Sequence, residues 1–599
     1  MTDRRRFVAL STSVTLWMGT VVAAMPPAVV AAASPTVVAA TPPAVAATVS
    51  SIPAFQAETT QPVRASQGMV VSETVHASKA GADVLAAGGN AVDAAIATGF
   101  ALAVTHPSAG NIGGGGFMVI RFPDGTTTAL DFREKAPLAA HPEMWLDESG
   151  EYSRTKHHRG ALSVGVPGTV AGFWKAHQLY GSQDWERLVR PAIGLARDGF
   201  ELTDRLARTL RSFVTGRGAA YEATVASYSN GGRPYSSGDR LIQTELGRTL
   251  ERIAVEGRDG FYAGETARLL VAEMEREGGI ITLEDLARYQ ARERTPVHGT
   301  YRGYDVISMP PPSSGGIALV EMLNILEGYD LAAMGHNSAD YVHHLVEAMR
   351  RAFRDRAQHV ADVDFADVPL HRLTSKDYAA TLRGEIDAAA ASVSAPSDIA
   401  DVYESLETTH YSVVDRNGMA VSVTYTLEGG YGSGITVSGA GFLLNNEMGD
   451  FNAGPGLTDA RGLIGTEPNL ARPEQRMLSS MTPSILAKDG ELVAVVGSPG
   501  GRTIINTVLQ VLLNMMEFDM NVGEAVAAPR LHHQWLPDRI RIESGGVSGA
   551  TAERLRRLGH TVSVGGSQGI AHSIMIDPET GDRLGAADAR NVDAAAAGN

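Results

Sequence analysis

The feature that most constrains this chain is an abrupt change of character between Glu407 and Thr408. Residues 386–407 are rich in Ala, Ser, Asp and Pro and have no sustained apolar period, which indicates a mobile linker. The residues that follow alternate between apolar and polar on both sides of Asn417-Gly418, and Asn-Gly is the strongest short signal for a β-hairpin. The sequence therefore predicts that Thr408 is the first residue of a strand into which a flexible segment leads.

The rest of the chain predicts a mixed α/β fold without tandem repeats. Apolar residues recur at helical spacing in 263–279 and 338–360, whereas 127–132 and 491–498 have the pattern of strands. Thr282 is expected to cap a helix, because Asp285 follows it three residues later. With 599 residues and 44% apolar content, the chain can bury a large core.

Charge and cysteine content exclude several classes of function. The chain has 67 acidic residues against 51 Lys and Arg, a formal charge of −16, and no long basic segment, so a nucleic-acid partner is not expected. The complete lack of cysteine excludes disulfides, thiolate catalysis and Cys-based zinc sites.

The N-terminal residues predict export. Residues 1–33 combine a basic start at Arg4–Arg6 with a moderately apolar stretch and small residues suited to signal cleavage, and the string RRRFV approaches the twin-arginine pattern. A membrane anchor fits less well, because the apolar run is interrupted and is followed by Pro26 and Pro27. Residues 34–65 read as an Ala/Pro-rich spacer, and no later segment is apolar enough to span a bilayer. We expect a periplasmic or secreted protein.

One candidate chemistry is a Ser-His-Asp hydrolase. The string GGSQG at 565–569 matches G-x-S-x-G, but that motif requires a strand, a sharp turn and then a helix, and strand-like residues follow here. The acid and the histidine would also have to come later in the chain, where few residues remain. A glycine-rich hairpin turn is the favoured interpretation.

A metal hydrolase is a second candidate. The 17 histidines include adjacent pairs at 157–158, 343–344 and 532–533. Adjacent side chains point in different directions on a strand or a helix, so such a pair cannot readily share one ion. We interpret these histidines as core or surface residues, and expect no metal and no cofactor.

The third candidate uses a new N-terminus at Thr408. If the bond before Thr408 were cut, the freed α-amino group, with an ordinary pKa of about 7.7–8.0, could act as general base for the adjacent hydroxyl. This would explain why a linker ends where a strand begins. A strand that merely starts with two β-forming threonines is the plainer alternative.

Longer strings decide between these alternatives. The chain resembles the γ-glutamyltranspeptidase, or glutathione hydrolase, family from about residue 68 to the C-terminus, in GGNAVDAAIATGFALAVTHPSAGNIGGGGFMVI, DFREKAP, YRGYDVISMPPPSSGG, TTHYSVVD, LLNNEMGDF, LSSMTPSIL and GSPGGRTIIN. The resemblance implies an N-terminal-nucleophile hydrolase fold, an α-β-β-α sandwich of four layers. It also implies a precursor that cuts itself before Thr408 into chains 66–407 and 408–599, which together form one intertwined domain.

The resemblance assigns the catalytic residues. Thr408 corresponds to the nucleophile that attacks the γ-carbonyl of glutathione and forms a γ-glutamyl ester, and Thr426 to the threonine that steadies its amino group. Gly500 and Gly501 correspond to the residues whose N–H groups stabilise the oxyanion. Since they lie between a predicted strand and a predicted helix, an ordinary turn is their simpler interpretation.

The same resemblance assigns the substrate-binding residues. Arg133, with Ser479 and Ser480, would hold the α-carboxylate of the donor, and Glu447 and Asp450 would hold its α-ammonium. Arg133 also has a plainer interpretation, as an ordinary ion-pair partner of its sequence neighbours Glu134 or Asp131.

Three positions depart from the family pattern. Glu428 stands where the family commonly has asparagine, and we expect it to join Glu447 and Asp450 around the donor's ammonium. Gly449 replaces a second aspartate of many relatives, and Arg461 stands within a lid-like segment, 452–464, where several relatives have an aromatic residue. These changes bear on donor range and acceptor choice.

The predicted activity is a ping-pong acyl transfer. The γ-glutamyl group would pass from glutathione or a similar donor to Thr408, and then to water, an amino acid or a short peptide. A glutaryl or cephalosporin-type acylase of the same fold is one alternative, which the acids placed for an ammonium disfavour. An exported, non-catalytic binding protein is another, and it would need neither a nucleophile nor oxyanion donors. The expected partners are small molecules and the chain's own two fragments.

Overall fold

Two seven-stranded antiparallel sheets organise the described part of the chain, which forms one compact unit. The computed structural model describes residues 61–395, 408–457 and 466–599, to which all structural statements below apply. The first sheet has the order β1 (Val63–Ala65), β18 (Arg583–Ala587), β17 (His572–Ile576), β13 (Glu491–Val496), β12 (Ser484–Lys488), β9 (Tyr304–Ser308) and β8 (Val297–Tyr301). The second has the order β19 (Ala595–Gly598), β2 (Met69–Ser72), β10 (Thr409–Val414), β11 (Ala420–Thr426), β3 (Gly115–Arg121), β4 (Thr127–Phe132) and β7 (Arg292–Arg294).

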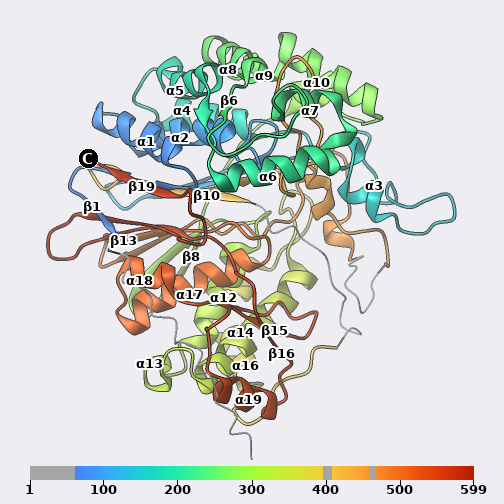
Figure 1. The fold of residues 1–599 in the computed structure, drawn as a ribbon. Coiled ribbons are helices and arrows are strands. Elements are labelled where there is room, and N and C mark those ends of the chain that lie inside the picture. The colour runs from blue at the N-terminus through green and yellow to red at the C-terminus, as the bar shows by residue number, and fades with distance from the viewer. Residues whose placement is uncertain (1–60, 396–407, 458–465) are drawn as a thin grey trace, which may run out of the picture. The chain divides into compact units, whose positions relative to one another are not determined.

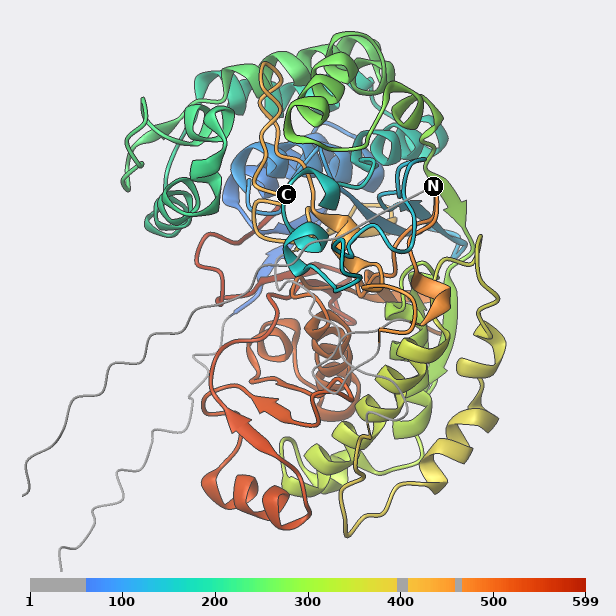
Figure 2. The same ribbon diagram turned by 90° about the vertical axis from the view of Figure 1, so that its right-hand side faces the viewer.

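The period-two pattern of the second sheet explains how the layers stack. In β3, Met118 and Ile120 belong to a core shared with helices, whereas Phe117 and Val119 face a core shared with the first sheet. Successive side chains of a strand point to opposite faces, so one strand serves both cores. Helices then cover the outer face of each sheet (Figure 1; Figure 2). The predicted four-layer α-β-β-α sandwich is confirmed.

The outer helices fall into two groups. Those beside the second sheet include α1 (Val75–Ala86), α2 (Ala91–Thr105), α4 (Thr169–Tyr180), α5 (Trp185–Asp198), α6 (Asp204–Thr215), α8 (Thr244–Glu256) and α10 (Gly264–Glu277). Those beside the first sheet include α12 (Gly315–Leu326), α14 (Ala339–His359), α16 (Lys376–Gly384), α17 (Thr503–Phe518) and α18 (Val522–Ala527). The helices expected at 263–279 and 338–360 are α10 and α14. Thr282 caps α11 (Leu283–Arg288) in a capping box with Asp285, as predicted.

The predicted hairpin is the centre of the second sheet. β10 and β11 pair in register from Thr409 opposite Tyr425 to Val414 opposite Ala420. Asp415 shapes the turn, because its Oδ1 accepts hydrogen bonds from the backbone N–H of Asn417 at 2.8 Å and of Met419 at 3.1 Å. Thr408 directly precedes β10 and Thr426 ends β11, so both threonines lie at the same end of the hairpin.

Two segments are more ordered than predicted. Val63–Ala65, assigned to the spacer, forms β1 and pairs with β18. The first part of the predicted mobile linker is also held in place, since the N–H of Ala391 donates to Leu558 O at 2.6 Å and the N–H of Ser392 to Glu347 Oε1 at 3.1 Å. Backbone hydrogen bonds to distant elements, which composition does not encode, give these segments their order. The predicted export signal and cleavage junction lie in residues outside the described ranges, apart from Thr408 itself.

The string GGSQG is a connection between two different sheets. It links β16 (Val562–Val564) to β17. β16 belongs to a small sheet that also contains β14 (Leu531–His532) and β15 (Ile540–Ile542), whereas β17 belongs to the first sheet. The hairpin turn predicted for it is therefore wrong, because β16 and β17 do not pair with each other. A strand follows the string, so the nucleophile-elbow geometry is excluded, as predicted. No helix in the described residues is long and apolar enough to cross a membrane.

Candidate active site

The predicted site residues come together from six separate stretches of the chain. All of them except Gly500 line one small cavity, together with Met481 and Ile504: Arg133, Thr408, Thr426, Glu428, Glu447, Asp450, Ser479, Ser480 and Gly501. We call this the donor cavity. Its volume is about 20 Å³, room for about one water molecule, so a larger ligand enters only if side chains move.

The two threonines form the hairpin end of the donor cavity. Both are buried, with 7% of Thr408 and 3% of Thr426 exposed. Thr426 is fixed by its neighbours: its Oγ1 accepts a hydrogen bond from the N–H of Glu428 at 2.9 Å, and its carbonyl accepts one from Asn111 Nδ2 at 2.8 Å. The open end of the central hairpin therefore carries the buried Thr408 next to the turn that follows Thr426.

Gly500 and Gly501 lie between β13 and the start of α17, as predicted. Both have left-handed backbones, with φ of 131° and 54°. A Cβ atom on Gly500 would come within 2.5 Å of Thr503 Oγ1, which itself donates to Gly500 O at 2.7 Å. Side chains are thus excluded by conformation and by space. The turn places backbone N–H groups at the positive end of the α17 dipole, where an anion is stabilised.

Arg133 pairs with acids across the donor cavity. It follows β4 and is fully buried, and its Nη1 and Nη2 donate to Glu447 and Asp450 of the short 3₁₀ helix Glu447–Asp450. Its Nε and Nη2 also donate to Met477 O at 3.3 Å and Leu478 O at 3.1 Å. Burial works against the charge, but attraction to the acids outweighs it and raises the pKa of Arg133.

The plainer interpretation of Arg133 does not account for these contacts. Glu134 lies 3.7 Å from Arg133 Nη1, farther than the acids across the cavity. Asp131 accepts a hydrogen bond from the backbone N–H of Arg133, at 3.0 Å, rather than from its guanidinium. The ion pairs of Asp131 are with Arg294, at 2.7 Å, and Arg476, at 3.2 Å.

Among the described residues, buried acids outnumber cations in and directly around the donor cavity, where Glu134 lies behind Arg133. Burial raises the pKa of Glu134 to about 8, and neither of its oxygens receives a hydrogen bond from the described residues. Burial also holds the pKa of Glu447 well above its usual range, and Glu134, Asp450 and Glu428 raise it further by repulsion. A ligand that brings a positive group would therefore relieve the repulsion. Glu134 was recognised in the sequence only as a neighbour of Arg133, because no motif signals a buried carboxyl without a hydrogen bond.

Ser479 and Ser480 are held by the helices beside the first sheet. Ser480 Oγ accepts a hydrogen bond from Nη2 of Arg356 in α14 at 2.9 Å. Ser479 Oγ accepts the N–H of Met481 at 3.2 Å, and Ser479 O accepts the N–H of Ser314 at 2.8 Å. Arg356 is a supporting residue that sequence reasoning missed, since it lies in a helical pattern far from any of the quoted strings.

Glu428 stands in the wall between the donor cavity and a larger pocket. It has φ of 73°, a left-handed backbone, and its Oε2 accepts a hydrogen bond from Asn446 Nδ2. Its Oε1 lies 3.9 Å from Nδ1 of His158, whose pKa burial and Arg154 lower to about 4. Gly449 leaves room for this histidine, because a Cβ there would lie 2.4 Å from His158 Nδ1. Arg461 falls outside the described residues.

Three potential metal ligands meet far from the donor cavity. His343 and Glu347 of α14 and His560 place one ligand atom each within 4.8 Å of one another. Each already has partners: the imidazoles are 2.8 Å apart, and Glu347 pairs with Arg350 at 3.3 Å and Arg351 at 2.7 Å. The adjacent His344 donates to Asp340 O at 2.7 Å and takes no part, which agrees with the prediction for neighbouring histidines.

Comparison with known proteins identifies the class to which this fold and site belong. The sequence pattern of the γ-glutamyltranspeptidase family matches residues 77–598. The chain is 48% identical over 546 residues to the glutathione hydrolase proenzyme of Escherichia coli (strain K12), with 91% of this chain and 94% of the relative covered. It is 38% identical over 510 residues to the acylase ACY 1 proenzyme of Pseudomonas sp. (strain SE83), with 84% and 88% covered.

Solved structures agree. The cephalosporin acylase from Bacillus halodurans matches with a TM-score of 0.80 at 27% identity, covering 90% of this chain and 97% of that one. The γ-glutamyltranspeptidase of Helicobacter pylori matches with a TM-score of 0.52 at 45% identity, covering 53% and 91%. The chain belongs to the γ-glutamyltranspeptidase family.

Proposed function

We propose that this protein is a glutathione hydrolase and γ-glutamyltransferase, produced as a precursor that cuts itself between Glu407 and Thr408. Its relatives include glutathione hydrolase proenzymes at up to 48% identity in the comparisons above. The observation that carries the proposal is the pairing of Arg133 with Glu447 and Asp450 inside the donor cavity.

A γ-glutamyl donor is suited to open these ion pairs. Its α-carboxylate can replace the acids on Arg133 while its α-ammonium takes the place of Arg133 beside Glu447 and Asp450, so that every buried charge keeps a partner. A glutaryl donor has the carboxylate alone and would leave the two acids facing each other without a cation. The cavity therefore favours the zwitterion over a glutaryl group.

Acylation of Thr408 is the first chemical step. The Thr408 hydroxyl oxygen attacks the γ-carbonyl carbon of the donor, and the freed α-amino group takes the proton of that hydroxyl. The amide C–N bond then breaks, the proton passes to the departing nitrogen, and the γ-glutamyl ester remains on Thr408. The N–H groups of Gly500 and Gly501 would stabilise the oxyanion, and Thr426 would orient the amino group.

Deacylation reverses these roles. Water, or the amine of an amino acid or short peptide, attacks the ester carbonyl and gives up a proton to the α-amino group. The ester C–O bond breaks, and the proton returns to the Thr408 oxygen. The products are glutamate or a new γ-glutamyl amide.

The two proposed chains, 66–407 and 408–599, would stay together after cleavage. The hairpin β10–β11 of the smaller chain pairs on one side with β2 and on the other with β3, both from the larger one. Both contribute residues to the donor cavity. We further propose that residues 1–33 direct export and that the predicted spacer, 34–65, precedes the larger chain, with its last three residues forming β1.

Matched donors test the function. Purified protein is assayed with γ-glutamyl-p-nitroanilide and glutaryl-p-nitroanilide, and with glutathione for release of glutamate. We expect kcat/KM for the γ-glutamyl anilide to exceed that for the glutaryl anilide by at least about tenfold. The glutaryl group would leave buried acids without a cation, and a buried charge without a partner costs more free energy than a tenfold change in kcat/KM represents. Preference for the glutaryl anilide would support the acylase alternative instead. Binding without turnover of either anilide would support a non-catalytic role.

A further inference from the structure

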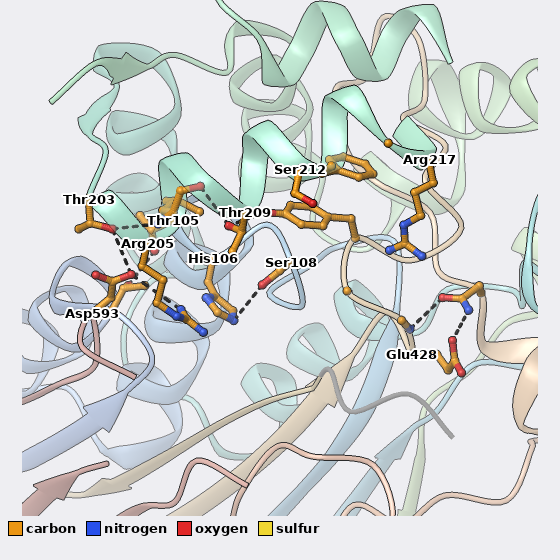
Figure 3. Close-up of a pocket in the computed structure, with 18 of the residues that line it drawn as sticks. Thr105, His106, Ser108, Thr203, Arg205, Thr209, Ser212, Arg217, Glu428 and Asp593 are labelled. Carbon is orange, nitrogen blue, oxygen red and sulfur yellow. Dashed lines mark hydrogen bonds and ion pairs between the residues drawn. The ribbon is translucent and has the colours of Figure 1, made fainter. Parts of the chain in front are cut away.

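The two walls of the donor cavity are supported in different ways. On the side proposed for the donor's ammonium, Glu428 borders a pocket of about 870 Å³, which we call the side pocket, and Figure 3 shows Glu428 at one end of it. On the side proposed for the α-carboxylate, Ser480 lies against Arg356 of α14, an arginine of which only 3% is exposed. The carboxylate wall is therefore packed against a buried cation, whereas the ammonium wall adjoins a second pocket.

Arg356 holds the serine segment through two hydroxyls. Its Nη2 donates to Ser480 Oγ at 2.9 Å, and its Nε donates to Ser314 Oγ at 2.8 Å. The hydroxyl of Ser314 donates in turn to Ser479 O at 2.7 Å. The backbone N–H of Ser314 donates to the same carbonyl at 2.8 Å, so Ser479 has a second support that does not depend on Arg356. Ser480 is thus the member of the serine pair that Arg356 contacts directly.

The contact with Arg356 restricts the orientation of the Ser480 hydroxyl. A serine hydroxyl can donate one hydrogen bond and accept two, whereas a guanidinium only donates. The hydroxyl hydrogen of Ser480 must therefore point away from Arg356. Ser480 lines the donor cavity and Arg356 does not, so a hydrogen in this orientation suits an acceptor inside the cavity. The adjacent positive charge also polarises the hydroxyl and makes it a stronger donor.

We propose that Arg356 is a positioning residue for the donor's α-carboxylate, and that it acts by fixing Ser480 as a hydrogen-bond donor. The hydroxyl of Ser480 donates to the carboxylate that Arg133 pairs with, and the charge of Arg356 lies one hydroxyl behind it. Because the hydroxyl is oriented before the donor enters, little rotational freedom is lost on binding. This inference rests on the proposed function, since it concerns the same γ-glutamyl donor.

A double-mutant cycle tests this role. Hydrolysis of γ-glutamyl-p-nitroanilide is measured for wild type, Arg356→Met, Ser480→Ala and the double variant, and kcat is expressed per molecule of cleaved protein. Methionine keeps an apolar side chain but has neither the charge nor the donors of arginine. We expect Arg356→Met alone to lower kcat/KM by at least about fivefold, the effect of one typical hydrogen bond. In the Ser480→Ala background the same change should lower kcat/KM by less than about twofold, because the hydroxyl through which Arg356 acts is gone.

Arg356→Lys is a second variant for the same cycle. Lysine keeps the charge but can reach only one of the two hydroxyls at a time, so its loss of kcat/KM should be smaller than that of Arg356→Met. If Arg356→Met does not give folded, cleaved protein, the cycle is run with Arg356→Lys instead. Its loss, too, should shrink in the Ser480→Ala background.

Arg354→Met is the matched control. Arg354 lies in the same helix, pairs with Asp355 at 3.3 Å and does not line the donor cavity, so its replacement should leave kcat/KM as in wild type. Wild-type kcat/KM in the Arg356 variant, or the same loss with and without the Ser480 hydroxyl, would overturn the proposal. Failure of wild-type protein to turn over the anilide at all would instead contradict the proposed function, so the two failures are distinguishable.

Discussion

The donor cavity uses one arginine to satisfy several buried acids. Arg133 contacts Glu447 and Asp450 directly and lies 3.7 Å from Glu134. Removing the cation of such a cluster is costly, because the acids that it contacts would then lose this buried partner or would have to take up a proton. A donor that brings one charge of each sign exchanges these ion pairs without changing the net charge. At this scale the specificity for a zwitterion follows from charge balance.

Arg133→Lys should separate charge from geometry. Lysine keeps the positive charge but loses the planar, two-pronged contact, and charged hydrogen bonds are worth about 1.5–3 kcal/mol each. We therefore expect kcat/KM for γ-glutamyl-p-nitroanilide to fall by more than about tenfold while self-cleavage is preserved. Arg288→Lys, a change at an exposed arginine paired with Glu474, is the control. Wild-type kinetics in Arg133→Lys would show that the arginine has only a structural role.

Glu428→Gln should move the acidic limb of the pH profile. Glu447 must be ionised to bind the donor's ammonium, and Glu428 is one of the acids that raise its pKa. Without that repulsion the pKa of Glu447 falls, so kcat/KM for the γ-glutamyl anilide should begin to rise at lower pH than in wild type.

The same variant should discriminate less between donors. Because one carboxylate fewer faces the donor's ammonium, the ratio of kcat/KM for γ-glutamyl against glutaryl anilide should decrease. Glu474→Gln, at a partly exposed glutamate outside the cavity, should change neither quantity. An unchanged ratio together with an unchanged acidic limb in Glu428→Gln would mean that Glu428 acts only on Asn446 and the side pocket.

The sequence was informative about which residues gather and uninformative about how they pair. Arg133, Glu447, Asp450 and the two serines were predicted from strings that resemble a family, and the structure places them in one cavity. The ion pairs between Arg133 and the acids were not predicted, since a motif records the residue that a ligand needs and not the contacts made across the cavity. Arg356 lies outside any of the quoted strings, and Asn446 lies inside LLNNEMGDF but was given no role there, because the string does not show that its side chain contacts Glu428.

At the scale of elements, two turns define the site. The β10–β11 hairpin places Thr408 and Thr426 at the same end, and the glycine turn before α17 brings Gly501 to the same cavity. The hairpin was predictable because Asn-Gly and alternating residues are local signals. The order of residues 386–395 was not, because it depends on hydrogen bonds to α14 and to Leu558 rather than on composition.

Gly500→Ala tests the glycine turn. Alanine is strained at φ of 131°, and its Cβ would lie 2.5 Å from Thr503 Oγ1. We expect the turn to shift and kcat to fall by about 10²-fold, the usual effect of losing one oxyanion donor. Gly490→Ala is the control, since Gly490 also has a positive φ, of 84°, but its Cβ would meet no atom within 4 Å. Both variants should lose some thermal stability, and a kcat in Gly500→Ala equal to that of Gly490→Ala would contradict the oxyanion role.

At the scale of the whole molecule, the two segments on either side of Thr408 form one sandwich. In the second sheet β10 and β11 of the later segment lie between β2 and β3 of the earlier one. In the first sheet β12 of the later segment pairs with β9 of the earlier one, and β18 pairs with β1. After a cut before Thr408, strands that pair with each other would therefore belong to different fragments. The two fragments should separate only when the sheets unfold. This intertwining could be expected from the family resemblance, but the strand order required the structure.

The most direct test of the account is the N-terminus of the smaller chain. Purified protein is run on a denaturing gel, its bands are sequenced from their N-termini, and glutathione hydrolysis is assayed in the same preparation. We predict two chains, a smaller one that begins Thr-Thr-His-Tyr, and hydrolytic activity, whereas Thr408→Ala should remain one uncut and inactive chain. A wild-type preparation that hydrolyses glutathione at full rate while Glu407 and Thr408 remain joined would contradict the account.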